Sequence, residues 1–278
     1  MDYNNKPDNP PPRRPHPLEG GAPQQQQRQE PQQPRERLAF NMPQSSPQIT
    51  YALIAINVFI FIIGATSIEL QNALFFAGWN DPMAVFNDGE YYRLFTAMFL
   101  HAGLAHIFFN AYALFILGPQ TEQMYGKARY LAIYMLGGVT GSVLSAGFGD
   151  PEIPSVGASG AVFALLGTQI VYLYRFRNEL GDWGRGALRQ YLVLLGINLF
   201  LGFTIAQIDN LGHIGGLIGG AILGWVLAPK LIARQLYDYT GNLTRVIDVE
   251  QRSGWETISV LYAVGLVAFL VFAGIMMF

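Results

Sequence analysis

The chain has 278 residues, of which 51% are hydrophobic and only 13% are charged. Soluble domains typically carry about 25% charged residues, so this composition disfavours a soluble globular class. A formal net charge of −2 disfavours a nucleic-acid partner. The absence of cysteine excludes disulfides, thiol nucleophiles and cysteine-bound metal sites.

Residues 1–48 form a Pro- and Gln-rich stretch without an apolar face. Such a segment cannot bury enough apolar surface to offset the entropy of the chain, so we expect a disordered tail. It contains no apolar stretch of the signal-peptide kind. We interpret the tail as a solvated spacer, and the alternative is a Pro-rich ligand for an unknown partner.

Seven apolar runs follow, most close to the length of about 20 residues that crosses a bilayer core. They cover residues 49–66, 94–117, 130–148, 158–174, 188–206, 211–228 and 258–278. Periodicity alone does not separate a membrane helix from a buried soluble helix. Seven runs in series, with charge confined to the gaps, predict an all-α polytopic membrane protein. We divide it into the tail, a membrane domain (49–232), a cytoplasmic linker (233–257) and an extra transmembrane helix (258–278).

The basic residues predict how the chain is oriented. If the runs cross the bilayer alternately, 16 of the 17 Lys and Arg residues lie on one side, and the opposite gaps hold only Arg93 among several acidic residues. The positive-inside rule then places the N-terminus in the cytoplasm and the C-terminus outside. The charge pattern and the lack of a transit-type N-terminus favour a prokaryotic plasma membrane.

The rare polar residues of the apolar runs gather at one depth. With this orientation the second, fourth and sixth runs all start on the exterior side. The second run carries His101, His106 and Asn110, the fourth carries Ser159, and the sixth carries His213. Polar groups inside a bilayer are costly, so their clustering indicates a function.

These residue types fit nucleophilic catalysis. A serine needs a base that removes its proton, and a neutral imidazole at His213 can accept it. Ser159 starts its helix, where backbone N–H groups lack intrahelical partners and favour an anion. His106 and Asn110 are four residues apart and share a helix face, so both can donate to an oxyanion. Asp209, four residues before His213, is interpreted as a loop carboxylate facing water, which favours a Ser–His dyad over a triad.

Small residues and one aromatic residue surround this pair. Gly157 permits unusual backbone conformations and Gly160 lets another helix approach closely. Gly216 and Gly220 form a small-xxx-small face that is expected to bring the sixth helix against the fourth. Phe163, four residues after the serine, is expected to pack on the histidine ring.

A carboxylate lies at the cytoplasmic end of the second run, in the pattern Gly118-x-x-x-Glu122-x-x-x-Gly126. Glu122 either binds backbone N–H groups of a loop or is a solvated interfacial carboxylate. The sequence leaves both alternatives open.

Taken together, these motifs resemble the rhomboid family of intramembrane serine proteases, over residues 50–228. The resemblance implies a rhomboid-like six-helix bundle with one added C-terminal helix and a water-filled site open to the exterior. It implies that Ser159 is the nucleophile and His213 the general base, with the oxyanion bound by His106, Asn110 and the Ser159 N–H group. It implies transmembrane protein substrates, cut near their exterior end, with the exterior loop and the fifth helix controlling entry, and no metal or cofactor.

Two positions depart from the pattern of many relatives. Tyr92-Arg93 stands where many have Trp-Arg, and Phe163 stands where some have Tyr. Arg93 and His101 have an alternative role as interfacial anchors, and Asn110 as a hydrogen-bonding contact between helices.

Three other functions fit the sequence less well. A catalytically inactive relative would bind membrane proteins without cutting them, but such relatives usually lack the serine or the histidine. A transporter would spread polar groups across the bilayer. A metalloprotease needs His-Glu-x-x-His, and no glutamate follows His101.

Overall fold

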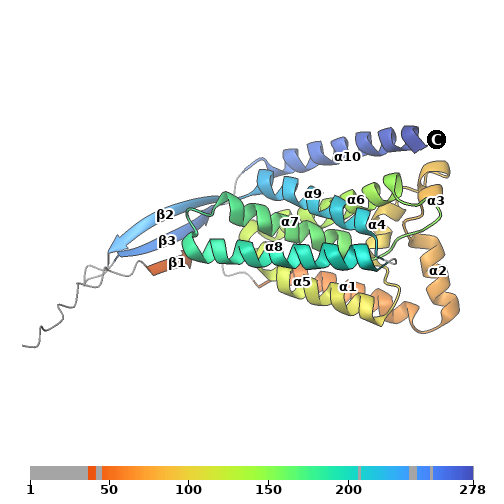
Figure 1. Cartoon of the computed structure of the whole chain (residues 1–278), viewed down its shortest axis with the longest axis horizontal. Coiled ribbons are helices and arrows are strands. Elements are labelled where there is room, and N and C mark those ends of the chain that lie inside the picture. Colours follow the sequence, from red (N-terminus) through yellow and green to blue (C-terminus); the bar gives the residue numbers. More distant parts are fainter. Residues whose placement is uncertain (1–36, 42–45, 206–207, 238–242, 251–252, 278) are drawn as a thin grey trace, which may run out of the picture. The chain divides into compact units, whose positions relative to one another are not determined.

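The computed structural model describes residues 37–41, 46–205, 208–237, 243–250 and 253–277. All seven apolar runs coincide with helices (Figure 1), which confirms a helical, polytopic membrane fold. These helices are α1 (Gln48–Gly64), α5 (Leu104–Tyr125), α6 (Lys127–Phe148), α7 (Ser159–Arg175), α8 (Gly181–Thr204), α9 (Asn210–Leu227) and α10 (Trp255–Met277). Most of the predicted tail lies outside the described residues, so the expected disorder there stays a prediction.

Among the described residues, α6, α8, α9 and α10 are long and apolar enough to cross a bilayer. The second apolar run adds a fifth candidate if its bent pair of helices counts as one span. Helix α1 is apolar but has only 17 residues, and α7 also has 17. Residues 161–169 of α7 are all buried by protein, so this helix does not need a long lipid-facing surface.

The second run is not the continuous helix that the sequence predicts. It folds as α4 (Arg93–Thr96), a 3-10 turn η1 (Ala97–Phe99) and then α5, with a bend of 93° between the two parts. Leu100 and Gly103 are extended, and Gly103 precedes the first turn of α5. The break therefore puts His101 in the connection and His106 in the first turn of the long helix.

The segment between α1 and α4, which the charge distribution predicts to be exterior and which we call the exterior loop, is itself helical. It contains α2 (Ile68–Gly78) and α3 (Pro82–Asn87). Each has a side-chain cap of the kind that satisfies free N–H groups at a helix start. Ser67 accepts from Leu70 N at 3.1 Å, and Asp81 accepts from Met83 N at 3.0 Å.

Helices α6, α7 and α9 form the densest packing in the described chain. Glycine makes this possible at the α7–α9 contact. A methyl group on Gly216 would overlap the carbonyl oxygen of Gly160, and one on Gly220 would overlap that of Ala164. The two backbones are therefore in direct contact along this face.

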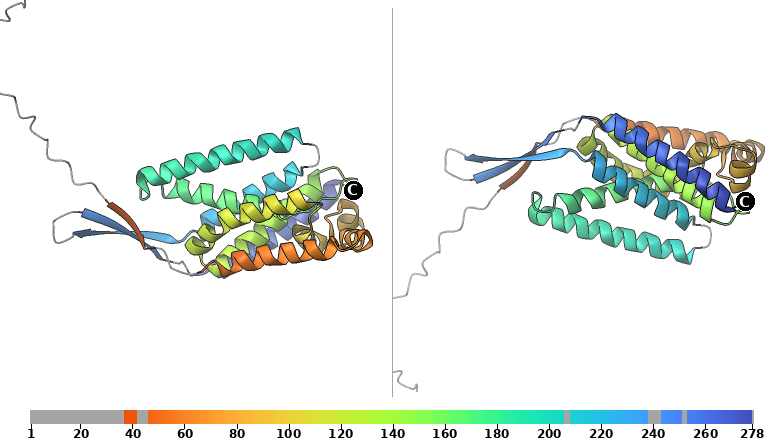
Figure 2. Two further views of the ribbon diagram at one scale, coloured as in Figure 1. Left: turned by 90° about the horizontal axis from the view of Figure 1, so that it is seen from below. Right: turned by 90° about the horizontal axis from the view of Figure 1, so that it is seen from above.

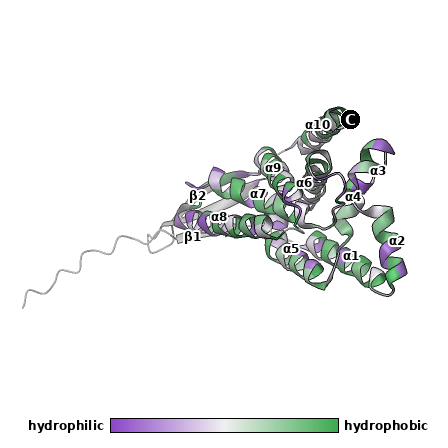
Figure 3. Cartoon of the chain, turned by 45° about the vertical axis from the view of Figure 1, so that its right-hand side comes forward, coloured by the Kyte–Doolittle hydropathy of each residue, from purple (hydrophilic) through white to green (hydrophobic). Residues whose placement is uncertain are grey.

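Helices α8 and α10 lie on opposite sides of α9 (Figure 2). Only 6% of the most apolar window of each is buried inside the protein. Their outward residues are hydrophobic, as are those of α1 and α5 (Figure 3). An apolar surface of this kind suits lipid rather than water.

A three-stranded sheet was not foreseen. Strands β1 (Arg37–Asn41), β2 (Lys230–Tyr237) and β3 (Leu243–Glu250) pair in the order β1-β3-β2, parallel for β1 and β3 and antiparallel for β2 and β3. The sheet includes five residues of the expected tail and much of the expected linker. The residues 246–249, Val-Ile-Asp-Val, are rich in β-branched side chains, which favour strands.

Candidate active site

Ser159 is the first residue of α7, and Ala158 precedes it as the N-cap. The first helical hydrogen bond of α7 runs from Val162 N to Ala158 O at 3.0 Å. No side chain of the described residues caps this end, so the N–H groups of its first turn are available. Gly157 has φ +127°, a backbone conformation that disfavours other residues, and its N–H group donates to Ala97 O at 2.9 Å.

His213 lies in the first turns of α9 and is partly buried. Its ring stacks on Phe163, with centroids 4.1 Å apart and an angle of 11° between the planes. Because Phe163 is one turn after Ser159, the imidazole covers the face of α7 that carries the serine. Among the described residues, Nδ1 of His213 has no hydrogen-bond partner. The structure thus brings together the histidine, the aromatic ring and the glycine contact that the sequence pointed to.

His106 and Asn110 approach the same turn from α5. A methyl group on Gly157 would lie 2.6 Å from His106 Nε2 and 3.8 Å from Asn110 Nδ2. Nδ1 of His106 accepts weakly from Ala102 N at 3.5 Å, which leaves the proton of a neutral ring on Nε2. Asn110 Nδ2 also donates to His106 O at 3.1 Å. Two side-chain donors therefore face the backbone that leads into Ser159.

A small cavity borders the serine. Ser142, Ser155, Ser159, Gly160 and Asp209 contribute to its lining. Asp209 lies in the loop before α9, as expected, but it is not simply a carboxylate in water. It is half-buried and is the N-cap of α9, where Oδ1 accepts from Gly212 N at 2.8 Å.

Glu122 is completely buried, which excludes the solvated alternative. Its carboxylate accepts from Ile49 N at 3.0 Å, from Thr50 N at 2.8 Å and from Thr50 Oγ1 at 2.8 Å. Thr50 Oγ1 also lies 3.0 Å from Tyr130 OH on α6. The carboxylate therefore binds the first turn of α1 rather than a loop.

Arg93 is not an interfacial anchor, because only 8% of the residue is exposed. Its guanidinium binds Glu90 through Nε at 2.5 Å. Nη1 donates to the carbonyl groups of Phe76 at 2.9 Å and Trp79 at 3.3 Å. Arg93 thus fixes the end of α2 to the start of α4, within the exterior loop.

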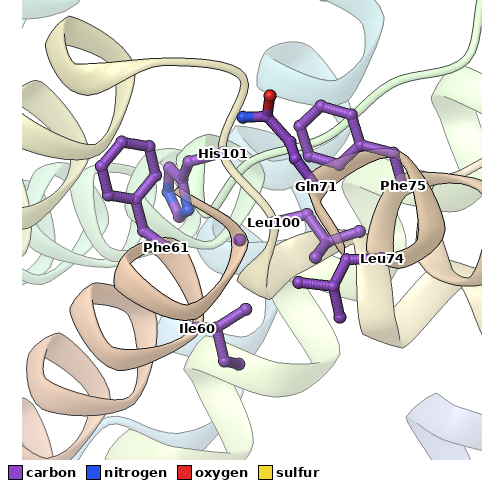
Figure 4. Close-up of a pocket in the computed structure, with 8 residues that line it drawn as sticks. Ile60, Phe61, Gln71, Leu74, Phe75, Leu100 and His101 are labelled. Carbon is purple, nitrogen blue, oxygen red and sulfur yellow. The ribbon is translucent and has the colours of Figure 1, made fainter. Parts of the chain in front are cut away.

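His101 does not lie at the surface either, with 2% exposure. It borders a small cavity with Phe61, Gln71 and Leu100 (Figure 4). Its ring meets the His106 ring edge-on, with centroids 5.0 Å apart. His101 therefore packs against the His106 ring and helps to hold its orientation.

Sequence reasoning missed Asn80, which is 1% exposed. Its backbone forms an antiparallel bridge with Ser155, with N···O distances of 2.9 and 3.0 Å. Its Nδ2 donates to Ser142 O at 3.0 Å. Asn80 thus ties the exterior loop both to α6 and to the segment that leads into Ser159. No local pattern around one loop asparagine indicates such a role.

Comparison with known proteins is consistent with this geometry. Residues 88–230 match the Rhomboid domain family model. The chain is 40% identical over 198 residues to Rhomboid protease GluP of Bacillus subtilis (strain 168). This alignment covers 69% of this chain and 37% of GluP. YdcA of the same organism is 33% identical over 190 residues, 66% of this chain and 90% of YdcA. RHOMBOID-like protein 6, mitochondrial, of Arabidopsis thaliana is 40% identical over 151 residues, 53% of this chain and 47% of that protein.

The matched region contains Ser159, His213, His106 and Asn110, together with the glycines of the α7–α9 contact. The chain spans little more than a third of GluP but nearly all of YdcA. The chain belongs to the rhomboid family.

Proposed function

We propose that this protein is an intramembrane serine endopeptidase that cleaves transmembrane segments near their exterior end. The observation that carries the proposal is the stacking of His213 on Phe163, one helical turn from Ser159. This stacking supports a base that lies beside the serine. No side chain of the described residues caps the N–H groups in the first turn of the serine helix. The similarity to Rhomboid protease GluP supports the same chemistry.

The reaction proceeds in two stages. His213 takes the proton of Ser159 Oγ as this oxygen attacks the scissile carbonyl. The carbonyl oxygen becomes negatively charged and accepts hydrogen bonds from the Ser159 N–H group, His106 Nε2 and Asn110 Nδ2. His213 then gives the proton to the leaving amine, and a water molecule activated by the same histidine hydrolyses the acyl-enzyme.

The exterior location of cleavage rests on topology. The proposed catalytic groups lie at the starts of α5, α7 and α9, and the distribution of Lys and Arg puts these starts outside. In this proposal the N-terminus is cytoplasmic, the C-terminus is exterior and the membrane is a prokaryotic plasma membrane. Residues 49–232 act as the catalytic domain, and substrates enter past α8 and the exterior loop.

The test is labelling of the full chain in detergent by a fluorophosphonate probe. Wild type is expected to react, and Ser159→Ala and His213→Ala are expected not to. Ser142→Ala is the matched control, because this serine borders the same cavity but has no part in the proposed chemistry. Thermal unfolding of each variant establishes that it is folded.

Labelling of Ser159→Ala at the wild-type rate would contradict the dyad. A folded wild type that neither labels nor cleaves a model single-span substrate, yet binds it, would instead identify an inactive binding protein.

A further inference from the structure

Asp209, which has no part in the proposed mechanism, lies both at the start of α9 and beside the cavity at Ser159. Its side chain caps the helix that carries His213, through the bond to Gly212 N. Its backbone oxygen accepts the His213 N–H group at 3.1 Å. It also lines the cavity that contains Ser159. Asp209 therefore contacts the first turn of α9 and also borders the cavity next to Ser159.

Within the described part of the chain, this carboxylate forms no ion pair. The ion pairs among the described residues are Arg93–Glu90 and Arg185–Asp182, and neither involves Asp209. A half-buried carboxylate without a cation gains from any positive charge that forms nearby. Such a charge forms in the proposed mechanism when His213 accepts the serine proton.

Asp209 is placed to act on that charge. It is the N-cap of α9, and the hydrogen bond from His213 N to its backbone oxygen holds the two residues one helical turn apart. Among the described residues, the titratable groups near enough to His213 to act on its charge are Asp209 and, from α5, His106. Because Nδ1 of His213 has no partner among the described residues, the carboxylate acts through space and not as the third member of a hydrogen-bonded triad.

We infer that Asp209 is a positioning residue for His213, whose negative charge stabilises the imidazolium formed during attack by Ser159. This inference rests on the proposed function. It is separate from the capping role, because an asparagine caps a helix about as well as an aspartate does. The two roles can therefore be separated by substitution.

The experiment measures the second-order rate of fluorophosphonate labelling and the thermal unfolding of the full chain in detergent. Asp209→Asn keeps the cap and removes the charge. It is expected to unfold like wild type and to label roughly tenfold more slowly, the scale of one opposite charge at close range. Asp209→Ala loses the cap as well, and is expected to unfold at a lower temperature and to label more slowly still.

Asp81→Asn is the matched control. Asp81 is also an N-cap on the exterior side, for α3, but it does not border the serine cavity. It is expected to label at the wild-type rate. Asp209→Asn at the wild-type rate, in a preparation whose Ser159→Ala variant is unreactive, would overturn this inference and leave the dyad intact. An unreactive wild type would overturn both.

Discussion

Asn110 combines two contacts in one nitrogen atom, which faces Gly157 and also donates to the carbonyl of His106. Asn110→Ala removes one oxyanion donor, so turnover is expected to fall by about 10²–10³. The measurement is kcat for cleavage of a model transmembrane substrate.

Helix α8 offers a matched control for that substitution. Asn198 Nδ2 donates to Leu194 O at 2.8 Å, the same bond to the carbonyl four residues back. Asn198→Ala is expected to leave kcat unchanged. If Asn110→Ala instead retained full turnover, its role would be confined to the helix contact.

Glu122 contributes to stability and not to chemistry. In Glu122→Gln an amide N–H₂ group replaces one acceptor oxygen, so a buried donor at Ile49 or Thr50 loses its partner. Such a loss costs about 1–3 kcal/mol. The melting temperature is expected to fall, while the labelling rate of the folded fraction stays at the wild-type value.

Glu152→Gln is the comparison for this change, because Glu152 is exposed. Its melting temperature should match that of wild type. An equal effect of the two substitutions would show that the hydrogen bonds of Glu122 add nothing to stability.

Single residues differ in how far the sequence predicts them. The sequence predicts that Ser159, His213, His106 and Asn110 meet, because alternating crossings place these polar residues of separate runs at one depth. Asn80 acts through backbone pairing with a distant segment, and Asp209 acts as the cap of α9. Neither mode leaves a periodic pattern, so the sequence did not reveal them.

Helices α7 and α9 depend on their glycine contact for the distance between serine and histidine. Gly220→Ala would push its methyl group into the carbonyl of Ala164. Overpacking of this kind typically costs about 1–3 kcal/mol. Both the melting temperature and the rate of fluorophosphonate labelling are expected to fall.

Gly196→Ala on α8 is the control, because a methyl group there would meet nothing within 4 Å. It is expected to label like wild type. A Gly220→Ala variant with wild-type labelling would mean that the helices can separate without disturbing the site.

Hydropathy located every long helix but not every boundary. Helix α8 begins seven residues before the apolar run, since Asp182 and Arg185 belong to its first turns. The break at Leu100–Gly103 includes His101 and Gly103, but two such residues hardly change the mean hydropathy of the run, so hydropathy predicts one continuous helix. The sheet pairs segments from opposite ends of the chain, and a local pattern does not encode such pairing.

At the scale of the whole molecule, α10 connects the membrane helices to the exterior loop. Its Tyr262 hydroxyl lies 2.7 Å from Thr140 Oγ1 of α6. Its Leu270 joins a buried cluster with Val85 of α3 and Leu94 of α4. The added helix thus completes a core that includes the loop in front of the site.

Enlarging α10 at this contact should disturb the loop. Ala273 is fully buried, and a methyl group on Gly147 would lie 3.0 Å from its Cβ. Ala273→Leu is therefore expected to lower the melting temperature and the labelling rate together. Val271→Leu, at a position 57% exposed, should change neither. Wild-type labelling in Ala273→Leu would show that the site does not depend on this packing.

The carboxylate of Glu122 also constrains the order in which the molecule assembles. Its partners at the start of α1 are 72 and 73 residues earlier in the chain. Because the chain is made from its N-terminus, α1 is complete before Glu122, the acceptor of its initial N–H groups, has been added. The first span can take its final place only after α5 has been made, so insertion and folding of α1 are separate events in time.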